Sequence, residues 1–227
     1  MDAAPDFRHV DVWIFDLDNT LYPAESRIFA QIEARMTLFV QQSLNLDEQD
    51  ARRVQKAYYR EHGTTLNGLM RIHGVDADAY LSFVHDIDIS ALEVDTALVD
   101  AIAGLPGRRF VFTNGCRNHA SRILERLALA GLFEELWDIR TIAFRPKQDP
   151  DSYRTVLARA GANPAHAAMF DDIARNLVPA HELGCTTVWL RNGSDWSKQG
   201  AEHPQGSPAH IDYETSDLRE FLQTIRI

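Results

Sequence analysis

Cysteines, basic residues and long apolar runs are all scarce in this sequence of 227 residues. Its two cysteines, Cys116 and Cys185, are too few for a disulfide framework or for a metal site built from cysteines. No apolar run is long enough to span a membrane, and the N-terminal MDAAPDFRHV lacks the basic and apolar regions of a signal peptide. The sequence therefore predicts a cytoplasmic protein that does not act at a membrane.

The chain is acidic, with 23 Lys and Arg against 33 Asp and Glu, and its formal net charge is -10 at pH 7. Such a chain repels the phosphate backbone of DNA and RNA, so a nucleic acid polymer is not expected as a partner. A small anionic ligand can still bind where local positive charge overcomes the field of the whole molecule.

Short apolar runs alternate with helical patterns along most of the chain. The runs are typical of strands buried on both faces of a parallel sheet, and they lie at residues 10–15, 109–113, 167–170 and 186–190. Apolar residues recur at helical spacing before Gly131, Gly161 and Gly184, and a glycine commonly follows the last turn of a helix. This alternation predicts an α/β fold, a Rossmann-like doubly wound parallel sheet. Residues 137–144 are a candidate for a further strand.

The stretch 23–105 breaks this alternation, because it contains several apolar stripes at helical spacing and no clear strand. We therefore expect an all-helical cap, residues 23–105, inserted into a core made of residues 1–22 and 106–227. Residues 192–210 are rich in Gly, Ser, Pro and Gln and predict a loop. Ser216 is the predicted N-cap of a final helix.

Four polar clusters lie at the ends of expected strands. They are Asp16-Leu17-Asp18-Asn19-Thr20, Thr113-Asn114-Gly115, Arg145-Pro146-Lys147 and Asp171-Asp172. The third cluster follows the less regular segment 137–144. In open α/β sheets, ligands bind in the crevice beyond the carboxyl ends of the strands. The four clusters are therefore expected to meet in one pocket.

Such a pocket would contain four carboxylates, those of Asp16, Asp18, Asp171 and Asp172. Like charges at short range cannot all ionise without compensation, which Lys147 and a divalent cation would supply. Ligands that are all oxygen atoms favour Mg²⁺ over zinc. The cation would also spread the charge of phosphate oxygens in a transition state. The clusters thus predict a magnesium site that handles a phosphate group.

Within that site the residue types suit different roles. A carboxylate at a strand end, as at Asp16, can attack phosphorus and form an aspartyl-phosphate. Asp18, two residues later, could protonate the leaving oxygen and then deprotonate the attacking water. Thr113 and Asn114 offer a hydroxyl, a backbone N–H and an amide for phosphate oxygens.

Each cluster alone also has an explanation without catalysis. An Asp-x-Asp or Thr-Asn-Gly segment usually belongs to a turn, Lys147 alone would be a surface lysine, and Asp171-Asp172 could cap a helix. The joint order of the clusters and their placement at strand ends favour a single active site.

These clusters resemble the four motifs of the haloacid dehalogenase superfamily of phosphatases, found here in FDLDNTLYP, VFTNG, RPK and FDDIARN. The resemblance implies that Asp16 is the nucleophile and a metal ligand. It implies that Asp18 is the acid/base and binds the metal through its backbone carbonyl. It further implies that Thr113 binds phosphate and that Lys147 neutralises the nucleophile and the phosphate.

The same resemblance extends to residues around the motifs. It implies that Asp172 is a metal ligand, that Asp171 sits where a second ligand is sometimes found, and that Asn176 holds a metal-bound water. Thr20 completes the first motif and is counted among the phosphate-binding residues. In two places the chain departs from the family pattern: Gln148 stands where proline is usual, and Ile173 stands where serine is common.

The helical insertion resembles the cap of one class of this superfamily. Together, WIFDLDNTLYP, YYREHGTTLNGL, FVHDIDIS and FTNG resemble the pyrimidine 5'-nucleotidase branch, which removes phosphate from UMP- or CMP-like mononucleotides. The implied partner is a small phosphorylated metabolite, a nucleoside monophosphate. Tyr59, Thr65 and Asn67 lie in a polar-aromatic cluster around Gly63 where a base could stack and form hydrogen bonds. The alternative is a helix-end loop that packs on the core.

Other interpretations stay open. The substrate could be another small phosphate ester, of a sugar or a lipid, or the enzyme could be a phosphomutase. A true dehalogenase would not need an acid at Asp18, and a non-catalytic relative would be expected to lack a catalytic residue. His85 and Asp86 could form a hinge contact. Cys116 is expected to pack rather than react.

Overall fold

The computed structural model describes residues 4–191 and 208–227, and it confirms the predicted α/β fold. Six parallel strands form one sheet in the order β3-β2-β1-β4-β5-β6. The strands are β1 (Val12–Phe15), β2 (Arg108–Phe112), β3 (Glu135–Trp137), β4 (Ala167–Asp171), β5 (Thr186–Leu190) and β6 (Tyr213–Thr215). The strand order reverses between β1 and β4, and the crevice at such a reversal is where doubly wound sheets bind ligands.

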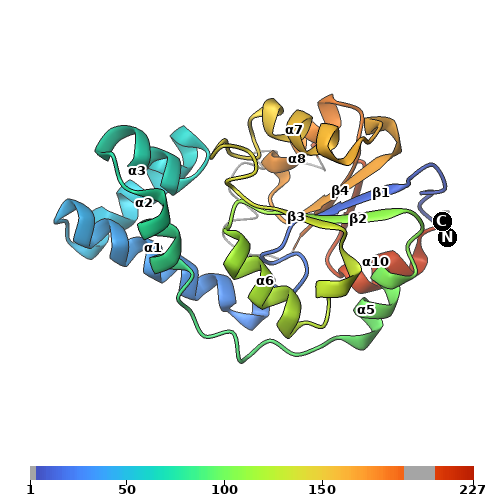
Figure 1. Ribbon diagram of the computed structural model, residues 1–227, viewed down its shortest axis with the longest axis horizontal. Coiled ribbons are helices and arrows are strands. Elements are labelled where there is room, and N and C mark those ends of the chain that lie inside the picture. The colour runs from blue at the N-terminus through green and yellow to red at the C-terminus, as the bar shows by residue number, and fades with distance from the viewer. Residues whose placement is uncertain (1–3, 192–207) are drawn as a thin grey trace.

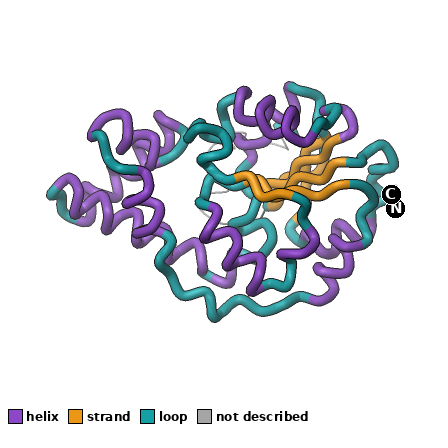
Figure 2. Tube along the Cα trace, in the orientation of Figure 1, coloured by secondary structure: helices purple, strands orange, loops and turns teal. Residues whose placement is uncertain are grey.

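Helices cover both faces of the sheet (Figures 1 and 2), which is why the central strands β1 and β4 are apolar as far as Asp171, the last residue of β4. One face carries α7 (Pro150–Ala160) and α8 (Ala174–Glu182). The other face carries α5 (Thr96–Ala103), α6 (Arg117–Arg126) and α10 (Leu218–Thr224). None of the described helices combines the length and the apolar character needed to cross a membrane.

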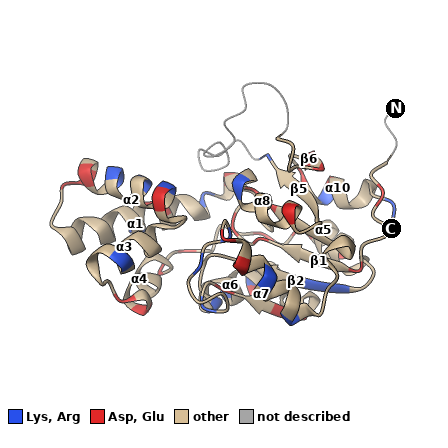
Figure 3. Ribbon diagram, turned by 90° about the horizontal axis from the view of Figure 1, so that it is seen from above, with Lys and Arg blue, Asp and Glu red and all other residues tan. Residues whose placement is uncertain are grey.

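Four helices form a separate bundle beside the sheet, called the cap below (Figures 1 and 3). They are α1 (Ile28–Leu44), α2 (Glu48–His62), α3 (Thr65–His73) and α4 (Ala77–Val84). Three of the four are started by a side chain that accepts a hydrogen bond from the first turn, at Asp47, Thr64 and Asp76. Short 3₁₀ turns complete the described elements, at Ala24–Ser26, Ala130–Leu132 and Pro164–His166.

The chain returns from the cap to the core through residues 85–95, which we call the strap. The next helix, α5, lies within the range 23–105 expected for the insertion, yet it packs against the core helix α10. Arg219 reinforces this contact, since its Nη1 lies 3.1 Å from Oδ2 of Asp95. The exact boundaries of the cap stay a prediction, with the last cap helix ending at Val84.

Two local predictions were wrong. Only residues 135–137 form a strand in the region where 137–144 was expected, because the chain turns after Trp137. Asp138 holds that turn by accepting a hydrogen bond from the backbone N–H of Thr141 at 3.1 Å. The final helix is capped by Asp217 rather than Ser216, since the Asp217 carboxylate accepts from Glu220 N at 3.0 Å. Most of the loop predicted at 192–210 lies outside the described residues.

Candidate active site

The floor of the site is built where β1 and β4 end side by side. Phe15 of β1 is in register with Phe170 of β4, and Asp16 N donates a hydrogen bond to Phe170 O at 2.8 Å. Asp16 therefore emerges next to Asp171 and Asp172, although the sequence separates them by most of the chain. Asp16 and the acidic pair thus flank the point where the strand order reverses.

Lys147 is completely buried between the carboxylates. Its ammonium donates hydrogen bonds to Oδ1 of Asp16 and, at 2.8 Å, to Oδ2 of Asp171. The other oxygen of Asp171 accepts from Asn176 Nδ2 and from Ile173 N, each at 2.9 Å. Asp171 is therefore engaged at both oxygens and fixes Lys147 against Asp16.

Burial governs the electrostatics of this cluster. It raises the pKa of Asp16 to about 7, against the opposing charge of Lys147 and with support from the charges of Asp171 and Asp18. Burial alone would lower the pKa of Lys147, but the charges of Asp16 and Asp171 raise it above its usual value. One ammonium therefore does not fully compensate the surrounding carboxylates, and a further cation would favour the ionised form of Asp16.

The carboxylates fit a metal ion. Asp16, Asp171 and Asp172 are all buried, and each can present an oxygen within 4.8 Å of the others. An all-carboxylate donor set suits a hard divalent cation. The structure thus contains a buried aspartate cluster able to bind a metal.

Asp18 lies beside the cluster and is held by two partners that the sequence did not reveal. Its Oδ1 accepts a hydrogen bond from the Tyr22 hydroxyl at 2.6 Å and lies 2.9 Å from Nε2 of His119. Burial acts to raise the pKa of Asp18, but the His119 ring and the Tyr22 hydroxyl bring that pKa below its usual value. The one signal for His119 was its place on the buried face of α6, where Ala120 and Ile123 are its apolar neighbours.

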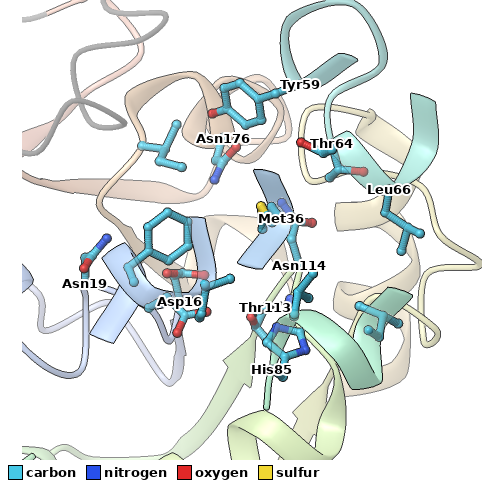
Figure 4. A pocket seen from close by; sticks show the side chains of 18 of the residues that line it. Asp16, Asn19, Met36, Tyr59, Thr64, Leu66, His85, Thr113, Asn114 and Asn176 are labelled. Carbon is cyan, nitrogen blue, oxygen red and sulfur yellow. Dashed lines mark hydrogen bonds between the residues drawn. The ribbon is translucent and has the colours of Figure 1, made fainter. Parts of the chain in front are cut away.

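The segment after β2 supplies polar groups to the same pocket. Thr113 is fixed by a hydrogen bond from its N–H to Trp137 O, and its hydroxyl accepts from Gly115 N, both at 2.9 Å. Asn114 is next to it, and within the described residues its buried side-chain oxygen has no hydrogen-bond partner. Both side chains line the pocket with Asp16 (Figure 4), so they are placed to contact a ligand.

The cap supplies the opposite wall of this pocket, and that wall is mostly apolar. The cavity measures about 110 Å³, and its lining from the cap comprises Phe29, Ile32, Met36, Tyr59, Thr64, Thr65, Leu66, Tyr80, Leu81 and Val84. Figure 4 shows Tyr59, Thr64 and Leu66 across the cavity from Asp16 and Thr113. The pocket therefore joins a charged floor to a wall with few hydrogen-bonding groups.

Two of the three residues predicted to recognise a base line this pocket. Tyr59 is 7% exposed, and the guanidinium of Arg175 lies 4.4 Å from the centre of its ring. Thr65 is buried, but its hydroxyl donates to Gln55 O at 3.2 Å. Asn67 lies outside the pocket.

The structure places Asn67 in a separate cleft between cap and core, where its amide donates to the backbone oxygen of His62 at 3.3 Å. Thr20 is also outside the pocket: it is buried, and its hydroxyl has no hydrogen-bond partner within the described residues. Of the two departures from the family pattern, Ile173 lines the pocket, and Gln148 donates to the side chain of Asn176.

The motifs and fold agree with a comparison against known families. Residues 10–184 match the family model described as haloacid dehalogenase-like hydrolase. This match covers well over half of the chain, which therefore belongs to the haloacid dehalogenase-like hydrolase family.

Solved structures show the same fold over nearly the whole chain. The HAD phosphatase from Thermococcus onnurineus is 16% identical, with a TM-score of 0.60 and coverage of 96% of this chain and 100% of that one. The magnesium-bound HAD-hydrolase YfnB from Bacillus subtilis is 16% identical, with a TM-score of 0.59 and coverage of 94% and 97%. L-2-haloacid dehalogenase from Xanthobacter autotrophicus is 16% identical, with a TM-score of 0.55 and the same coverage. Identities this low show the fold alone.

A curated relative is Phosphate metabolism protein 8 from Saccharomyces cerevisiae, which is 28% identical over 190 residues. The match covers 76% of this chain and 59% of that protein, so the chain spans about three fifths of the relative's length.

Proposed function

We propose that the protein is a Mg²⁺-dependent phosphomonoester hydrolase that prefers pyrimidine nucleoside 5'-monophosphates such as UMP and CMP. One observation carries the hydrolase assignment: Asp16 is held by the buried Lys147 beside Asp171 and Asp172, at the point where the strand order reverses. A nucleophile, a fixed cation and carboxylate ligands in one pocket are the parts that transfer of a phosphoryl group requires.

In the first step, a carboxylate oxygen of Asp16 attacks phosphorus and the bond from phosphorus to the leaving oxygen breaks. Asp18 donates a proton to that oxygen, which departs as an alcohol. In the free site the pKa of Asp18 is lowered, and the negative charge of a bound phosphate acts in the opposite direction and favours the protonated acid. Thr113 and Lys147 hold phosphate oxygens as their charge develops, because their donors are fixed in place before the reaction.

In the second step, water attacks the phosphorus of the aspartyl-phosphate. Asp18 takes the proton from the water, the bond between phosphorus and Asp16 breaks, and inorganic phosphate leaves. Both residues then return to their starting states.

Asp16 and Asp172 would hold the Mg²⁺ ion, with the backbone carbonyl of Asp18, and Asp171 stands next to them. When bound, Mg²⁺ supplies positive charge that offsets the phosphate oxygens. Asn176 is fixed against Asp171 and is the proposed holder of a metal-bound water.

The shape of the pocket supports a substrate with a flat, weakly polar group. The Tyr59 ring, fixed by Arg175, can pack against a base, and Thr64 supplies a hydroxyl at the same wall. The apolar cap wall also favours a second candidate, a lipid phosphate, over a sugar phosphate, whose hydroxyls would find few partners there.

The assignment is tested by measuring phosphate release with Mg²⁺ from UMP, CMP, a sugar phosphate and a lipid phosphate. We expect the two nucleotides to be hydrolysed best. Faster hydrolysis of the lipid or sugar phosphate would contradict the proposed substrate and leave the fold unaffected.

The mechanism is tested with the Asp16→Asn variant, which should bind UMP but release no phosphate, because an amide is a poor nucleophile. Binding is followed by calorimetry and phosphate by a colorimetric assay. Turnover by this variant at the rate of the unchanged protein would rule out Asp16 as the nucleophile.

A further inference from the structure

We propose that His119 is a positioning residue for Asp18, and that it fixes which oxygen of the Asp18 carboxylate faces the substrate. The inference rests on the proposed function, in which Asp18 transfers the protons. It adds a residue from α6, outside the four motifs, to the machinery of the reaction.

The first observation is that two donors converge on one oxygen. The Tyr22 hydroxyl, 2.6 Å away, and His119 Nε2, 2.9 Å away, both contact Oδ1 of Asp18. Two donors that meet at one oxygen fix the rotation of the carboxylate, so Oδ2 is the oxygen that can exchange a proton with the leaving group or with water.

The second observation is that, among the described residues, the ring nitrogens of His119 make one hydrogen bond, the contact with Asp18. The ring is completely buried, and within residues 4–191 and 208–227 its Nδ1 has no hydrogen-bond partner. While the Asp18 carboxylate is ionised, its contact with Nε2 places the hydrogen on Nε2. A buried ring with one hydrogen bond, directed at Asp18, indicates a role in orienting that carboxylate.

The third observation is that the ring itself is fixed from the other side. His85 stacks on His119, with ring centres 4.4 Å apart and planes 13° from parallel, and Nδ1 of His85 lies 3.2 Å from the Cys116 sulfur. Gly115 lies beside the pair, since a Cβ there would be in van der Waals contact, at 3.5 Å, with an atom of each ring. The stack leaves His119 little freedom to turn away from Asp18.

The stack also joins the cap to Asp18, because His85 is the first residue of the strap after α4 and lines the pocket (Figure 4). Arg122, one turn after His119 on α6, donates to the backbone oxygens of His85 and Ile87, each at 3.2 Å. The helix that carries His119 is therefore also hydrogen-bonded to the strap. Through this stack the position of the cap bears on the orientation of Asp18.

The test uses leaving groups that differ in their need for a proton. An alkyl phosphate such as UMP needs an acid to protonate its leaving oxygen, whereas p-nitrophenol leaves readily without one. Single-turnover release of p-nitrophenol and of uridine isolates the first step from hydrolysis of the aspartyl-phosphate. A positioning role affects the uridine reaction selectively, and a defect in folding lowers both reactions together.

We expect His119→Ala to slow the release of uridine by about 100-fold or more, the usual scale of acid catalysis, and to slow p-nitrophenol release by less than about fivefold. His119→Gln, which can place an amide N–H near Oδ1, should recover most of the loss. Equal losses on the two substrates in His119→Ala would overturn the inference, as would unchanged uridine release.

Ile123→Ala is the matched control, because Ile123 is buried on the same helix one turn away and its apolar side chain cannot hydrogen-bond to Asp18. It should lower thermal stability and keep the ratio of the two rates. If the unchanged protein releases no phosphate from any ester, the proposed function fails. If it does so and His119→Ala shows no selectivity, the inference about His119 alone fails.

Discussion

Lys147 allows Asp16 and Asp171 to be buried next to each other, because its positive charge compensates their carboxylates. All three side chains are inside the protein, and the ammonium contacts both carboxylates. Removing one member of a buried charged set is strongly destabilising, because the remaining charges lose their compensation. The same lysine therefore serves both stability and the proposed chemistry.

We predict that Lys147→Met lowers the free energy of unfolding by about 3–5 kcal/mol at pH 8 when metal is chelated, the usual cost of breaking a buried ion pair. The loss should shrink on acidification. A carboxyl whose pKa is raised by folding, as for Asp16, binds protons more readily folded than unfolded, so protonation adds stability as pH falls below about 7. Urea unfolding at pH 8 and pH 5.5 measures both effects.

Lys56→Met is the control for this substitution, since Lys56 lies on the cap helix α2 and no ion pair involves it among the described residues. It should change stability by less than about 0.5 kcal/mol. A similar loss in the two variants would show that the buried contacts of Lys147 are not the cause.

The sequence could reveal the charged residues of the site but not the partners that hold Asp18. Asp16, Asp18 and Asp172 were predictable because each follows a strand, and strand ends meet at one edge of a parallel sheet. Lys147 was predicted as the compensating charge, although the strand expected before it ends at Trp137. The contact between Asp18 and His119 joins positions 101 residues apart, and no local pattern encodes it. The sequence showed only that His119 lies on the apolar face of a helix, and this does not identify Asp18 as its partner.

At the scale of elements, the turn between α2 and α3 is docked on the segment that carries Lys147. Gly63 in that turn has a φ of +80°, and an added Cβ would lie 2.4 Å from Pro146 Cγ and 2.8 Å from Gln148 Oε1. A side chain of any size would thus push the cap away from the loop on which the site depends.

We predict that Gly63→Ala lowers kcat/KM for the best substrate by about 10- to 100-fold, because small displacements of catalytic groups have effects of that order. Gly74→Ala is the matched control. Gly74 also ends a cap helix with positive φ, +65°, but an added Cβ there would meet no atom within 4 Å. Steady-state kinetics should show a loss only at Gly63, and equal losses at both sites would point to backbone strain instead.

Helices and strands with a strong apolar periodicity were predicted well. Element boundaries that depend on a hydrogen bond from a single side chain were not. The stripes of α1 to α4 and the runs of β1, β2, β4 and β5 were visible because burial repeats along them. The strand expected at 137–144 failed because Asp138 captures the backbone in a turn. Asp217 starts the last helix although the adjacent Ser216 offers an equally suitable cap.

At the scale of the whole molecule, a metal ion should act as a stabilising ligand. Any ligand that binds only the folded chain raises the free energy of unfolding, by about 2.7 kcal/mol at 100 times its dissociation constant. We predict that Mg²⁺ raises the melting temperature, that a chelator abolishes phosphate release, and that Asp172→Asn removes most of the thermal shift.

Asp11→Asn serves as the control, because Asp11 is exposed and precedes β1, at the end of the sheet opposite to Asp172. Its thermal shift with Mg²⁺ should equal that of the unchanged protein. A full shift in Asp172→Asn would place the ion elsewhere.

The central strand has a consequence for synthesis of the chain. β1 leaves the ribosome before both of its neighbours, which begin at Arg108 and Ala167. The cap helices are complete by Val84 and contact each other through nearby segments, so they can fold while β1 still waits for its partners. Asp16 meets Asp171 only when translation has passed β4, so the pocket forms after the cap helices.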